Sequence, residues 1–358
     1  MKILLLSRFG RLGASSRIRS YQYISYLKQH GIDITVSPLL GDTYLSDFYF
    51  GKANHIKARI YPYLFRILSL LKSYRFDLLW IEKELFPWLP CLGELLLTYA
   101  KIPYVVDYDD AIFHRYDSHS NKYIQTFLGN KIDVIMRHAN LVIVGNDYLL
   151  QHAKYAGAKY VKYLPTVVDL KKYRVKQIKN GLFTIGWIGT PITVKYLEFI
   201  RPALSELFQD NRSHLVTIGA EFSGMESNYV TNVSWSEDSE ISDVQKFDVG
   251  IMPLPDNLWA KGKCGYKLIQ YMACGKPVIA SPVGVNSKIV EHGVNGFLAN
   301  SKEEWISALT LLRDNPELRK KMGEAGRKKV EKEYCLQVTQ PQLSALLTTL
   351  DQNSHLKN

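Results

Sequence analysis

The sequence predicts an α/β protein of two domains, each built on a doubly wound sheet of parallel strands. Its 358 residues exceed what one hydrophobic core usually organises. Short apolar runs alternate with helix-length segments, which is typical of parallel strands joined by right-handed crossovers. The alternation forms two series, separated by a polar, Lys-rich stretch after Pro165 that suits an interdomain linker.

Strand-length apolar runs define both series. The first series consists of residues 3–6, 34–36, 78–81, 104–106 and 141–144. The second consists of residues 183–188, 215–218, 249–252 and 277–280. A charged helical stretch (316–330) and an apolar helix (338–350) follow. We therefore expect domains at 1–170 and 182–335, a linker at 171–181, and a C-terminal helix at 336–358 that packs back on the first domain.

Composition and the N-terminus predict a cytoplasmic protein. A content of 46% hydrophobic and 22% charged residues excludes wholesale disorder. MKILLLS is too short for a signal-peptide core and indicates a first buried strand, and no apolar run reaches the roughly 18 residues of a membrane span. The four cysteines have no metal-site or disulfide spacing, so we expect reduced thiols: Cys91, Cys264, Cys274 and Cys335.

A net charge of +11 favours an anionic partner. Between Lys52 and Arg75, basic residues alternate with apolar ones, which on a helix gives an apolar surface edged with cations. One interpretation is a segment resting on an anionic membrane surface, and the other is a core helix with solvated basic edges. Because the basic residues cluster with apolar ones and at phosphate-type loops, no nucleic-acid partner is expected. The basic residues are Lys52, Lys57, Arg59, Arg66, Lys72 and Arg75.

Ligands of open α/β sheets bind at the carboxyl ends of the strands, and two loops of the first domain are unusual there. After the first strand, Gly10 and Gly13 permit close backbone approach, and Arg17 and Arg19 add positive charge before a helix N-terminus. A dinucleotide site is disfavoured because the Gly-x-Gly-x-x-Gly fingerprint is absent, whereas a tight turn without ligand remains an alternative.

The second unusual loop carries three carboxylates after the fourth strand, at Asp107, Asp109 and Asp110. Like charges this close repel one another, so their presence indicates a cation or hydrogen-bond donors that use them. A metal-nucleotide site is one interpretation, and carboxylates that accept from sugar hydroxyls are the favoured one. At least one of the three is also expected to cap the next helix.

Two further loops lie in the second domain. In GWIGTPITVK, Gly189 frees the backbone, Thr190 offers a hydroxyl and an amide, and Lys195 on the following helix is a candidate phosphate contact or a solvated surface residue. In the run 261–286, a Gly- and Lys-rich loop leads into a helix that ends at Cys274-Gly275. Lys263 and Lys267, near that helix start, predict a diphosphate site.

The segment YMACGKPVIASPVGVN, followed by IVEHGVNGFLA, resembles the C-terminal signature of retaining GT-B glycosyltransferases of the family 4 type. GASSR, DYDDAIF and GWIGTP occur in the expected order, so the resemblance covers nearly the whole chain. It is strongest to bacterial enzymes of exopolysaccharide, capsule or O-antigen assembly. The resemblance implies a GT-B architecture of two facing Rossmann-like domains with an interdomain cleft, the first on the acceptor side and the second binding a nucleotide-sugar.

The chain departs from the family pattern at charged positions. The first signature glutamate, which acts at the sugar, matches Gly262, so that role has no carboxylate here. The second, which holds the ribose, matches Gln270, whose side chain can still form hydrogen bonds but carries no charge. The arginine after the first strand of the second domain matches Trp187, and the neighbouring lysine matches Lys195. The family's His-Asp pair matches Asp109-Asp110.

The resemblance implies a metal-independent hexosyltransferase without cofactor, which moves a sugar with retention from a nucleoside-diphosphate sugar to a glycan or lipid-linked acceptor. The implied pathway is cell-surface polysaccharide synthesis, on the inner face of the membrane. The catalytic candidates are Asp109, Lys195, Lys263 and Lys267. The acceptor or phosphate contacts are Arg17, Arg19 and Asp110. The donor-binding candidates are Gly13, Gly189, Thr190, Cys264, Gly265, Tyr266 and Gln270.

Two alternatives remain from the sequence. A sugar-nucleotide epimerase or hydrolase of the same fold would share the donor site but lack an acceptor groove. A non-catalytic sugar-nucleotide-binding subunit is compatible with the loss of both glutamates.

Overall fold

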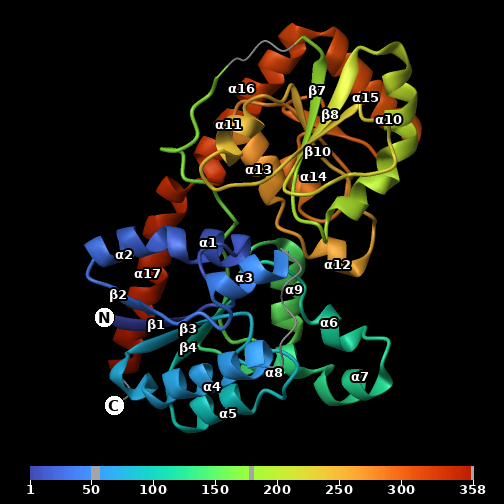
Figure 1. Cartoon of the computed structure of the whole chain (residues 1–358). Coiled ribbons are helices and arrows are strands. Elements are labelled where there is room, and N and C mark those ends of the chain that lie inside the picture. Colours follow the sequence, from blue (N-terminus) through green and yellow to red (C-terminus); the bar gives the residue numbers. More distant parts are fainter. Residues whose placement is uncertain (50–56, 177–180, 356–358) are drawn as a thin grey trace. The chain divides into compact units, whose positions relative to one another are not determined.

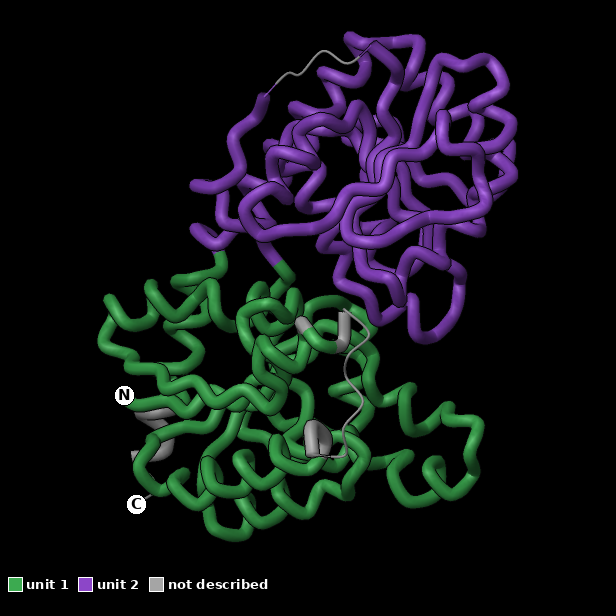
Figure 2. Tube along the Cα trace, in the orientation of Figure 1, with its two compact units in different colours: residues 1–166, 339–358 green, residues 167–338 purple. Residues whose placement is uncertain are grey.

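The computed structural model describes residues 1–49, 57–176 and 181–355. The chain forms two compact units, shown in different colours in Figure 2. Unit 1 comprises residues 1–166 and 339–358, and unit 2 comprises residues 167–338. The chain therefore leaves unit 1 once and returns to it near the C-terminus. The expected boundaries were residues 170 and 336, with a linker at 171–181.

Unit 1 contains a six-stranded parallel sheet with the order β2-β1-β3-β4-β5-β6. The reversal at β1 places the helices on both faces. Figure 1 shows α2 and α17 on one face and α4, α5 and α8 on the other. The strands are β1 (Lys2–Leu6), β2 (Asp33–Val36), β3 (Leu78–Glu82), β4 (Tyr104–Tyr108), β5 (Leu141–Val144) and β6 (Val161–Tyr163).

The helices of unit 1 are short apart from α4 and α17. Helix α17 begins in unit 2 and continues into unit 1, where Leu343 and Leu347 are fully buried and the Thr339 and Tyr23 hydroxyls are 2.9 Å apart. The helices are α1 (Ala14–Arg19), α2 (Ile24–Gln29), α3 (Asp42–Tyr49), α4 (Lys57–Leu71), α5 (Leu92–Tyr99), α6 (His114–Asp117), α7 (Lys122–Leu128), α8 (Lys131–His138), α9 (Asp147–Tyr155) and α17 (Leu336–His355).

Unit 2 contains a second six-stranded parallel sheet, with the order β12-β11-β10-β7-β8-β9. One face packs on α10 and α15, and the other on α13 and α16. Its strands are β7 (Phe183–Ile188), β8 (Ser213–Ile218), β9 (Val230–Val233), β10 (Val249–Met252), β11 (Val278–Ala280) and β12 (Gly296–Leu298). Its helices are α10 (Arg201–Leu207), α11 (Glu240–Val244), α12 (Leu258–Lys261), α13 (Tyr266–Ala273), α14 (Asn286–Ile289), α15 (Lys302–Asp314) and α16 (Pro316–Glu333), with a 3₁₀ segment η3 (Val194–Ile200).

The expected α/β class with two parallel sheets is confirmed, and all nine predicted strands are present. Three edge strands were not predicted, namely β6, β9 and β12. They are three or four residues long and only partly buried, so they lack a continuous apolar run. All four cysteines are free thiols. Within the described ranges, no helix has the length and apolar character that crossing a bilayer requires.

Candidate functional site

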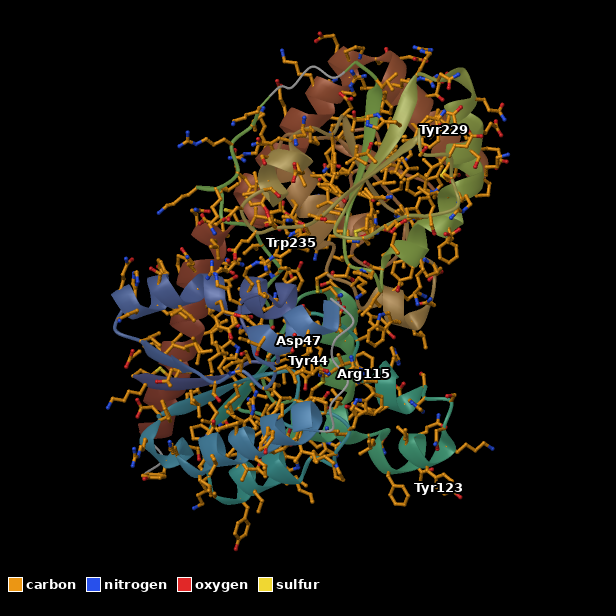
Figure 3. The ribbon with its side chains drawn as sticks, in the orientation of Figure 1. Tyr44, Asp47, Arg115, Tyr123, Tyr229 and Trp235 are labelled. Atoms are coloured by element: carbon orange, nitrogen blue, oxygen red, sulfur yellow. The ribbon has the colours of Figure 1, made fainter. Side chains whose placement is uncertain are left out.

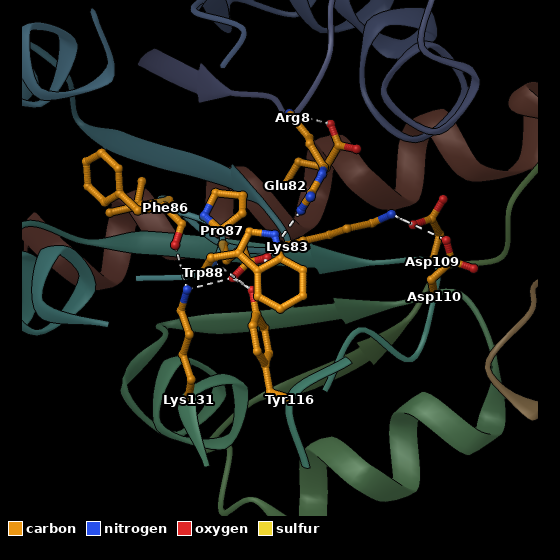
Figure 4. Close-up of polar contacts among 12 residues, drawn as sticks. Arg8, Glu82, Lys83, Phe86, Pro87, Trp88, Asp109, Asp110, Tyr116 and Lys131 are labelled. Carbon is orange, nitrogen blue, oxygen red and sulfur yellow. Dashed lines mark hydrogen bonds and ion pairs between the residues drawn. The ribbon is translucent and has the colours of Figure 1, made fainter. Parts of the chain in front are cut away.

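A buried lysine connects the loops that follow β3 and β4 in unit 1. Lys83 Nζ lies 2.7 Å from Asp109 Oδ1 and 3.5 Å from Asp110 Oδ2, as Figure 4 shows. The Ser15 hydroxyl, from α1, donates to the other oxygen of Asp109. Three loops at the carboxyl edge of the sheet therefore converge on Asp109, as the topology predicts.

The electrostatic balance fixes Asp109 as a carboxylate. Burial by itself raises the pKa of Asp109, but the Lys83 ammonium and the Ser15 hydroxyl outweigh it and lower the pKa to about 2. Burial likewise opposes the charge of Lys83, yet Asp109, Asp110 and Glu82 raise its pKa above the ordinary value. Asp109 is thus a strong hydrogen-bond acceptor and a weak base near neutral pH.

Lys83 occupies an unusual backbone conformation. Its φ is +67°, in the left-handed region that residues with a Cβ disfavour. Such a conformation costs on the order of 1–3 kcal/mol and persists where surrounding contacts impose it. Here the Lys83 amide donates to the Asp107 carbonyl at 3.0 Å, and the side chain is held by Asp109.

Asp107 and Arg19 form a buried structural pair rather than a ligand site. Arg19 Nε and Nη2 donate to the two oxygens of Asp107 at 2.8 and 3.0 Å, and Nη1 donates to the Leu164 carbonyl at 2.8 Å. Arg19 is only 3% exposed. The Arg19 guanidinium thus joins α1, β4 and the residue that follows β6, and its expected contact with acceptor or phosphate stays a prediction.

The glycine-containing loop after β1 is also tied down internally. Gly13 precedes α1, and a side chain there would collide with Phe9. Arg17 is buried near the Arg11 carbonyl. Glu82 accepts from the Arg8 amide at 3.0 Å and from the Ser16 hydroxyl. The loop thus has a rigid backbone, which keeps Ser15 beside Asp109.

A second buried network centres on Glu84. Its carboxylate accepts from Lys131 Nζ at 2.7 Å, from the Tyr116 hydroxyl at 2.8 Å and from Arg8 Nη1 at 3.2 Å (Figure 4). Burial raises the pKa of Glu84, but Lys131 and Arg8 outweigh it and lower that pKa. The carboxylate is therefore charged, and it anchors the loop that runs from β3 to Trp88.

Helix α6 follows the loop that carries these carboxylates. It begins after Phe113, whose side chain makes no cap hydrogen bond, and capping by one of the carboxylates stays a prediction. Asp107 and Asp109 pair with Arg19 and Lys83. These pairs neutralise the two carboxylates that a metal-nucleotide interpretation would use.

In unit 2, the structure brings Lys267 to the loop after β7. Lys267 Nζ lies 3.9 Å from the centroid of the Trp187 ring, a cation–π contact. A Cβ on Gly189 would lie 2.5 Å from the same nitrogen, so only glycine leaves room for it. Within the described ranges, no carboxylate pairs with Lys267. Burial and, second, the Lys263 ammonium lower the pKa of Lys267 well below its usual value.

The start of α13 depends on Gly265. Its φ is +67°, and a Cβ there would collide with Ile289, so a glycine is required. Cys264 is buried and Tyr266 is half-buried on either side of it. Lys263 lies 5.6 Å from the Trp259 ring centroid. The loop thus places two ammonium groups near the first turn of an eight-residue helix, where anions are stabilised.

Thr190 directly follows Gly189, and Lys195 lies further along the chain, on η3. The Thr193 hydroxyl accepts from the Thr190 amide at 3.1 Å, which closes a turn after Gly189. Lys195 lies on η3, is exposed, and contacts the Tyr196 ring at 5.8 Å. Of the three predicted phosphate lysines, Lys263 and Lys267 are close enough for the Lys263 ammonium to lower the pKa of Lys267.

Gln270 lies inside the unit 2 core. It is 3% exposed, and its Nε2 donates to the Tyr173 hydroxyl at 3.1 Å. Burial raises the pKa of Tyr173 well above its usual value, so the hydroxyl is neutral. The expected ribose contact by Gln270 stays a prediction.

The basic and apolar segment 52–75 differs from the expected pattern at one position. Arg66 on α4 is 2% exposed, and its Nη2 donates to the Ser7 carbonyl at 2.6 Å. Burial lowers the pKa of Arg66 to about 10. Lys52 lies outside the described residues, as do the side chains of Lys57 and Arg59. The expectation that Arg66 lies at the edge of an exposed surface is wrong, because its side chain is buried against the end of β1.

The exposed face of α4 is apolar instead. Leu92, Leu96 and Tyr99 of α5 add further exposed apolar side chains. Lys72 and Arg75 are exposed just beyond the end of α4. Contiguous apolar surface of this kind is typical of an interaction site. The exposed residues on and after α4 are Ile60, Tyr61, Leu64, Phe65, Ile67, Leu68, Leu71 and Tyr74.

The sequence analysis missed Ser15, Lys83, Glu84 and Lys131 as parts of the site. A signal was present, since Glu82-Lys83-Glu84 follows the apolar run 78–81 directly and charged residues at the carboxyl end of a buried strand indicate a site. Lys131 carried no such signal, because it lies on α8, away from any strand end.

Comparisons with known proteins concern the family and the fold. Residues 244–329, which include α13, match the family model of glycosyl transferases group 1. An uncharacterized glycosyltransferase of Methanocaldococcus jannaschii is 27% identical over 271 residues, which cover 69% of either chain.

Three solved structures have the same fold. HepE of Anabaena, in complex with UDP-glucose, is 18% identical with a TM-score of 0.74, over 98% of this chain and 100% of that one. WaaG, a glycosyltransferase involved in lipopolysaccharide biosynthesis, is 14% identical with a TM-score of 0.69, over 97% and 100%. A glycosyltransferase of Rickettsia africae is 14% identical with a TM-score of 0.68, over 98% of each chain. The two sheets thus match the two-domain Rossmann-like GT-B fold, and the comparisons together support a glycosyltransferase of group 1.

Proposed function

We propose that the chain transfers a hexosyl group from a nucleoside-diphosphate sugar to a hydroxyl of a glycan or lipid-linked acceptor, with retention and without a metal. The observation that carries the proposal is the Lys267 ammonium, which lies beside Gly189 and Trp187 without a carboxylate partner among the described residues. It lies within the segment that matches group 1 glycosyltransferases.

Cleavage of the anomeric C–O bond leaves negative charge on the departing diphosphate. Preorganised cations and amides lower this barrier most directly. Lys267 and Lys263, with the backbone of Gly189 and Gly265, would stabilise that charge. The bound diphosphate would in turn favour the ammonium form of Lys267, whose pKa burial and Lys263 depress.

Asp109 would orient the sugar or the acceptor hydroxyl. A carboxylate with a pKa of about 2 accepts hydrogen bonds well but removes protons poorly near neutral pH. The acceptor proton would therefore pass to the leaving diphosphate oxygen as the new glycosidic bond forms, which agrees with retention. Ion pairing of Asp107 and Asp109 supports the metal-independent scheme.

The exposed apolar face of α4 and α5 supports a membrane-associated role. No acidic residue occurs between Lys52 and Phe76, so this surface is complementary to anionic lipid. Leucine and aromatic side chains would enter the interface, with Lys72 and Arg75 at the headgroups. A lipid-linked acceptor of cell-surface polysaccharide synthesis fits such a location.

A thermal-shift panel with UDP, GDP, ADP and their sugars tests the donor class, because a ligand that binds only the folded chain raises the melting temperature. Product analysis with and without acceptor then separates the alternatives. Free sugar or epimer formed without acceptor would indicate a hydrolase or epimerase. Binding without turnover in the presence of membranes would indicate a non-catalytic subunit.

A further inference from the structure

Trp88 has a left-handed backbone conformation, and its side chain is partly exposed to solvent. It follows the loop from β3, its φ is +65°, and its amide donates to the Tyr116 hydroxyl at 3.1 Å. Its ring packs edge-on against Tyr116 at 5.4 Å and His119 at 5.9 Å, yet Trp88 is 47% exposed. A strained, ordered and exposed indole is a feature of ligand sites, because aromatic rings present a flat apolar face.

Positive charge gathers around this indole. Arg115 Cζ lies 5.9 Å from the Trp88 ring centroid, and Arg8 and Lys131 share the single carboxylate of Glu84. Glu84 is also bonded to Tyr116, so its acceptor capacity is used. Within the described part of the chain, Arg115 has no carboxylate partner. Burial and, second, Arg8 lower the pKa of Arg115, and the charges of Glu84 and Asp110 offset this only in part.

The cluster adjoins the Asp109 site. Arg8 follows β1, Trp88 follows β3 and Arg115 follows β4, all at the carboxyl edge of the unit 1 sheet. Figure 4 draws Arg8, Trp88 and Tyr116 together with the Lys83–Asp109 pair. Asp110 is also among the charges that act on Arg115. A saccharide with one hydroxyl at Asp109 could therefore extend towards Trp88.

We propose that Trp88, Arg115 and Arg8 form an acceptor subsite for an anionic saccharide. The apolar face of a sugar packs on the Trp88 indole, and phosphate, diphosphate or carboxylate oxygens of the acceptor accept hydrogen bonds from the Arg115 and Arg8 guanidinium groups. The proposal rests on the proposed glycosyltransferase function, because only then is the saccharide an acceptor. It specifies the acceptor class, which the donor site does not.

Binding of four probes to the full chain tests the subsite: glucose, glucuronic acid, glucose 6-phosphate and geranyl diphosphate. Affinities are measured by saturation-transfer NMR with UDP present, so that the diphosphate site of unit 2 is occupied. We expect the anionic probes to bind more tightly than glucose. Preference for the two anionic sugars would place the anion on the glycan, and preference for geranyl diphosphate would place it at a lipid linkage.

Variants decide whether these residues are responsible. Arg115→Gln should weaken the anionic probes by about ten- to a hundredfold, the scale of one hydrogen bond to a charged group, and should leave glucose almost unchanged. Trp88→Leu should weaken the sugar probes, charged or neutral. Arg137→Gln removes an exposed arginine on α8, elsewhere in unit 1, and serves as the matched control. Circular dichroism and the melting temperature establish that each variant is folded.

Different results would contradict the acceptor subsite and the proposed glycosyltransferase function. Equal binding of glucose and the anionic probes, or an Arg115→Gln variant that binds like the parent, would overturn the subsite. If the UDP-induced thermal shift persists in that case, the donor site is unaffected. Absence of any shift with nucleoside diphosphates in the parent chain would instead count against the proposed function.

Discussion

Lys83 Nζ and Asp109 Oδ1 are 2.7 Å apart, and both side chains are almost removed from solvent. Two isolated charges at these positions would be unfavourable, since each would lose its hydration. Together they fix the conformation of the loops after β3 and β4. In the proposed mechanism, the pair would hold Asp109 in place for a substrate hydroxyl, and Lys83 would act only through the Asp109 carboxylate.

Replacing Lys83 should raise the pKa of Asp109 and destabilise unit 1. Lys83→Met leaves a buried carboxylate without its cation, which typically costs about 3–5 kcal/mol. Asp109 would then protonate at higher pH, so the acidic limb of the activity profile should move upwards. Chemical denaturation and pH–rate profiles measure the two effects. The double variant Lys83→Met/Asp109→Asn should recover part of the stability, and no recovery would show that the residues are not coupled.

The same pair gives a definite acid dependence of stability. The pKa of Asp109 is about 2 in the fold, below its value of about 3.9 in an unfolded chain. Its contribution is thus fully present above about pH 4 and is lost as the pH falls towards 2. Urea unfolding at several pH values should show this loss in the parent chain and a smaller one in Asp109→Asn. Identical pH dependence of the two would contradict the assigned pKa.

Asp109→Asn should lower turnover at least tenfold, about 1.4 kcal/mol in the barrier, and leave nucleoside-diphosphate affinity nearly unchanged. The reason is that Asp109 belongs to unit 1, whereas Lys263 and Lys267 belong to unit 2. Steady-state kinetics and calorimetric titration with UDP or GDP separate the two quantities. An equal loss of nucleotide affinity would show that Asp109 contacts the nucleotide, contrary to this assignment.

Lys267 should govern both turnover and the pH dependence of diphosphate binding. Lys267→Ala should reduce turnover by about tenfold to a thousandfold, and Lys263→Ala should act similarly. Because the pKa of Lys267 is depressed, its ammonium is lost as the pH rises, so affinity should fall at a lower pH than for an ordinary lysine. Titrations above pH 7.5 avoid the phosphate ionisation near pH 6. Lys267→Arg should remove this pH dependence, and a diphosphate affinity that does not change with pH in the parent chain would contradict the assigned role of Lys267.

Full activity in the presence of EDTA is expected, because the proposed mechanism uses no metal.

The apolar face of α4 should bind anionic vesicles. Replacing Leu64, Phe65 and Leu68 with Gln removes three exposed side chains, each contributing roughly 1.5–3 kcal/mol when buried, so cosedimentation should be lost without loss of folding. Leu311→Gln, exposed in unit 2, is the control. Lys72→Glu with Arg75→Glu should weaken binding in a salt-dependent manner. Vesicle binding that survives the triple change would remove the membrane interpretation.

Arg66→Glu is unsuitable as a test, since it should unfold the region around Ser7.

The sequence predicted the central strands and the Lys267 loop because both depend on local pattern. Buried parallel strands are continuous apolar runs, and Gly265 is required by local backbone geometry. Pairings between distant residues were not predictable, since no local pattern links Lys83 to Asp109 or Lys131 to Glu84. Arg66 was misplaced for a related reason. Helical spacing does not tell which side of a mostly apolar helix faces the core.

The return of α17 to unit 1 has a consequence for biosynthesis. Thr339 contacts Tyr23, and Leu343 and Leu347 are buried in the unit whose sheet is made from residues 2–163. Unit 2 is continuous in sequence and needs no residue of the tail for its core. Unit 1 is discontinuous, and its apolar layer on α17 is translated only after the whole of unit 2. The unit whose sheet is made first therefore cannot be completed before the second unit has been made.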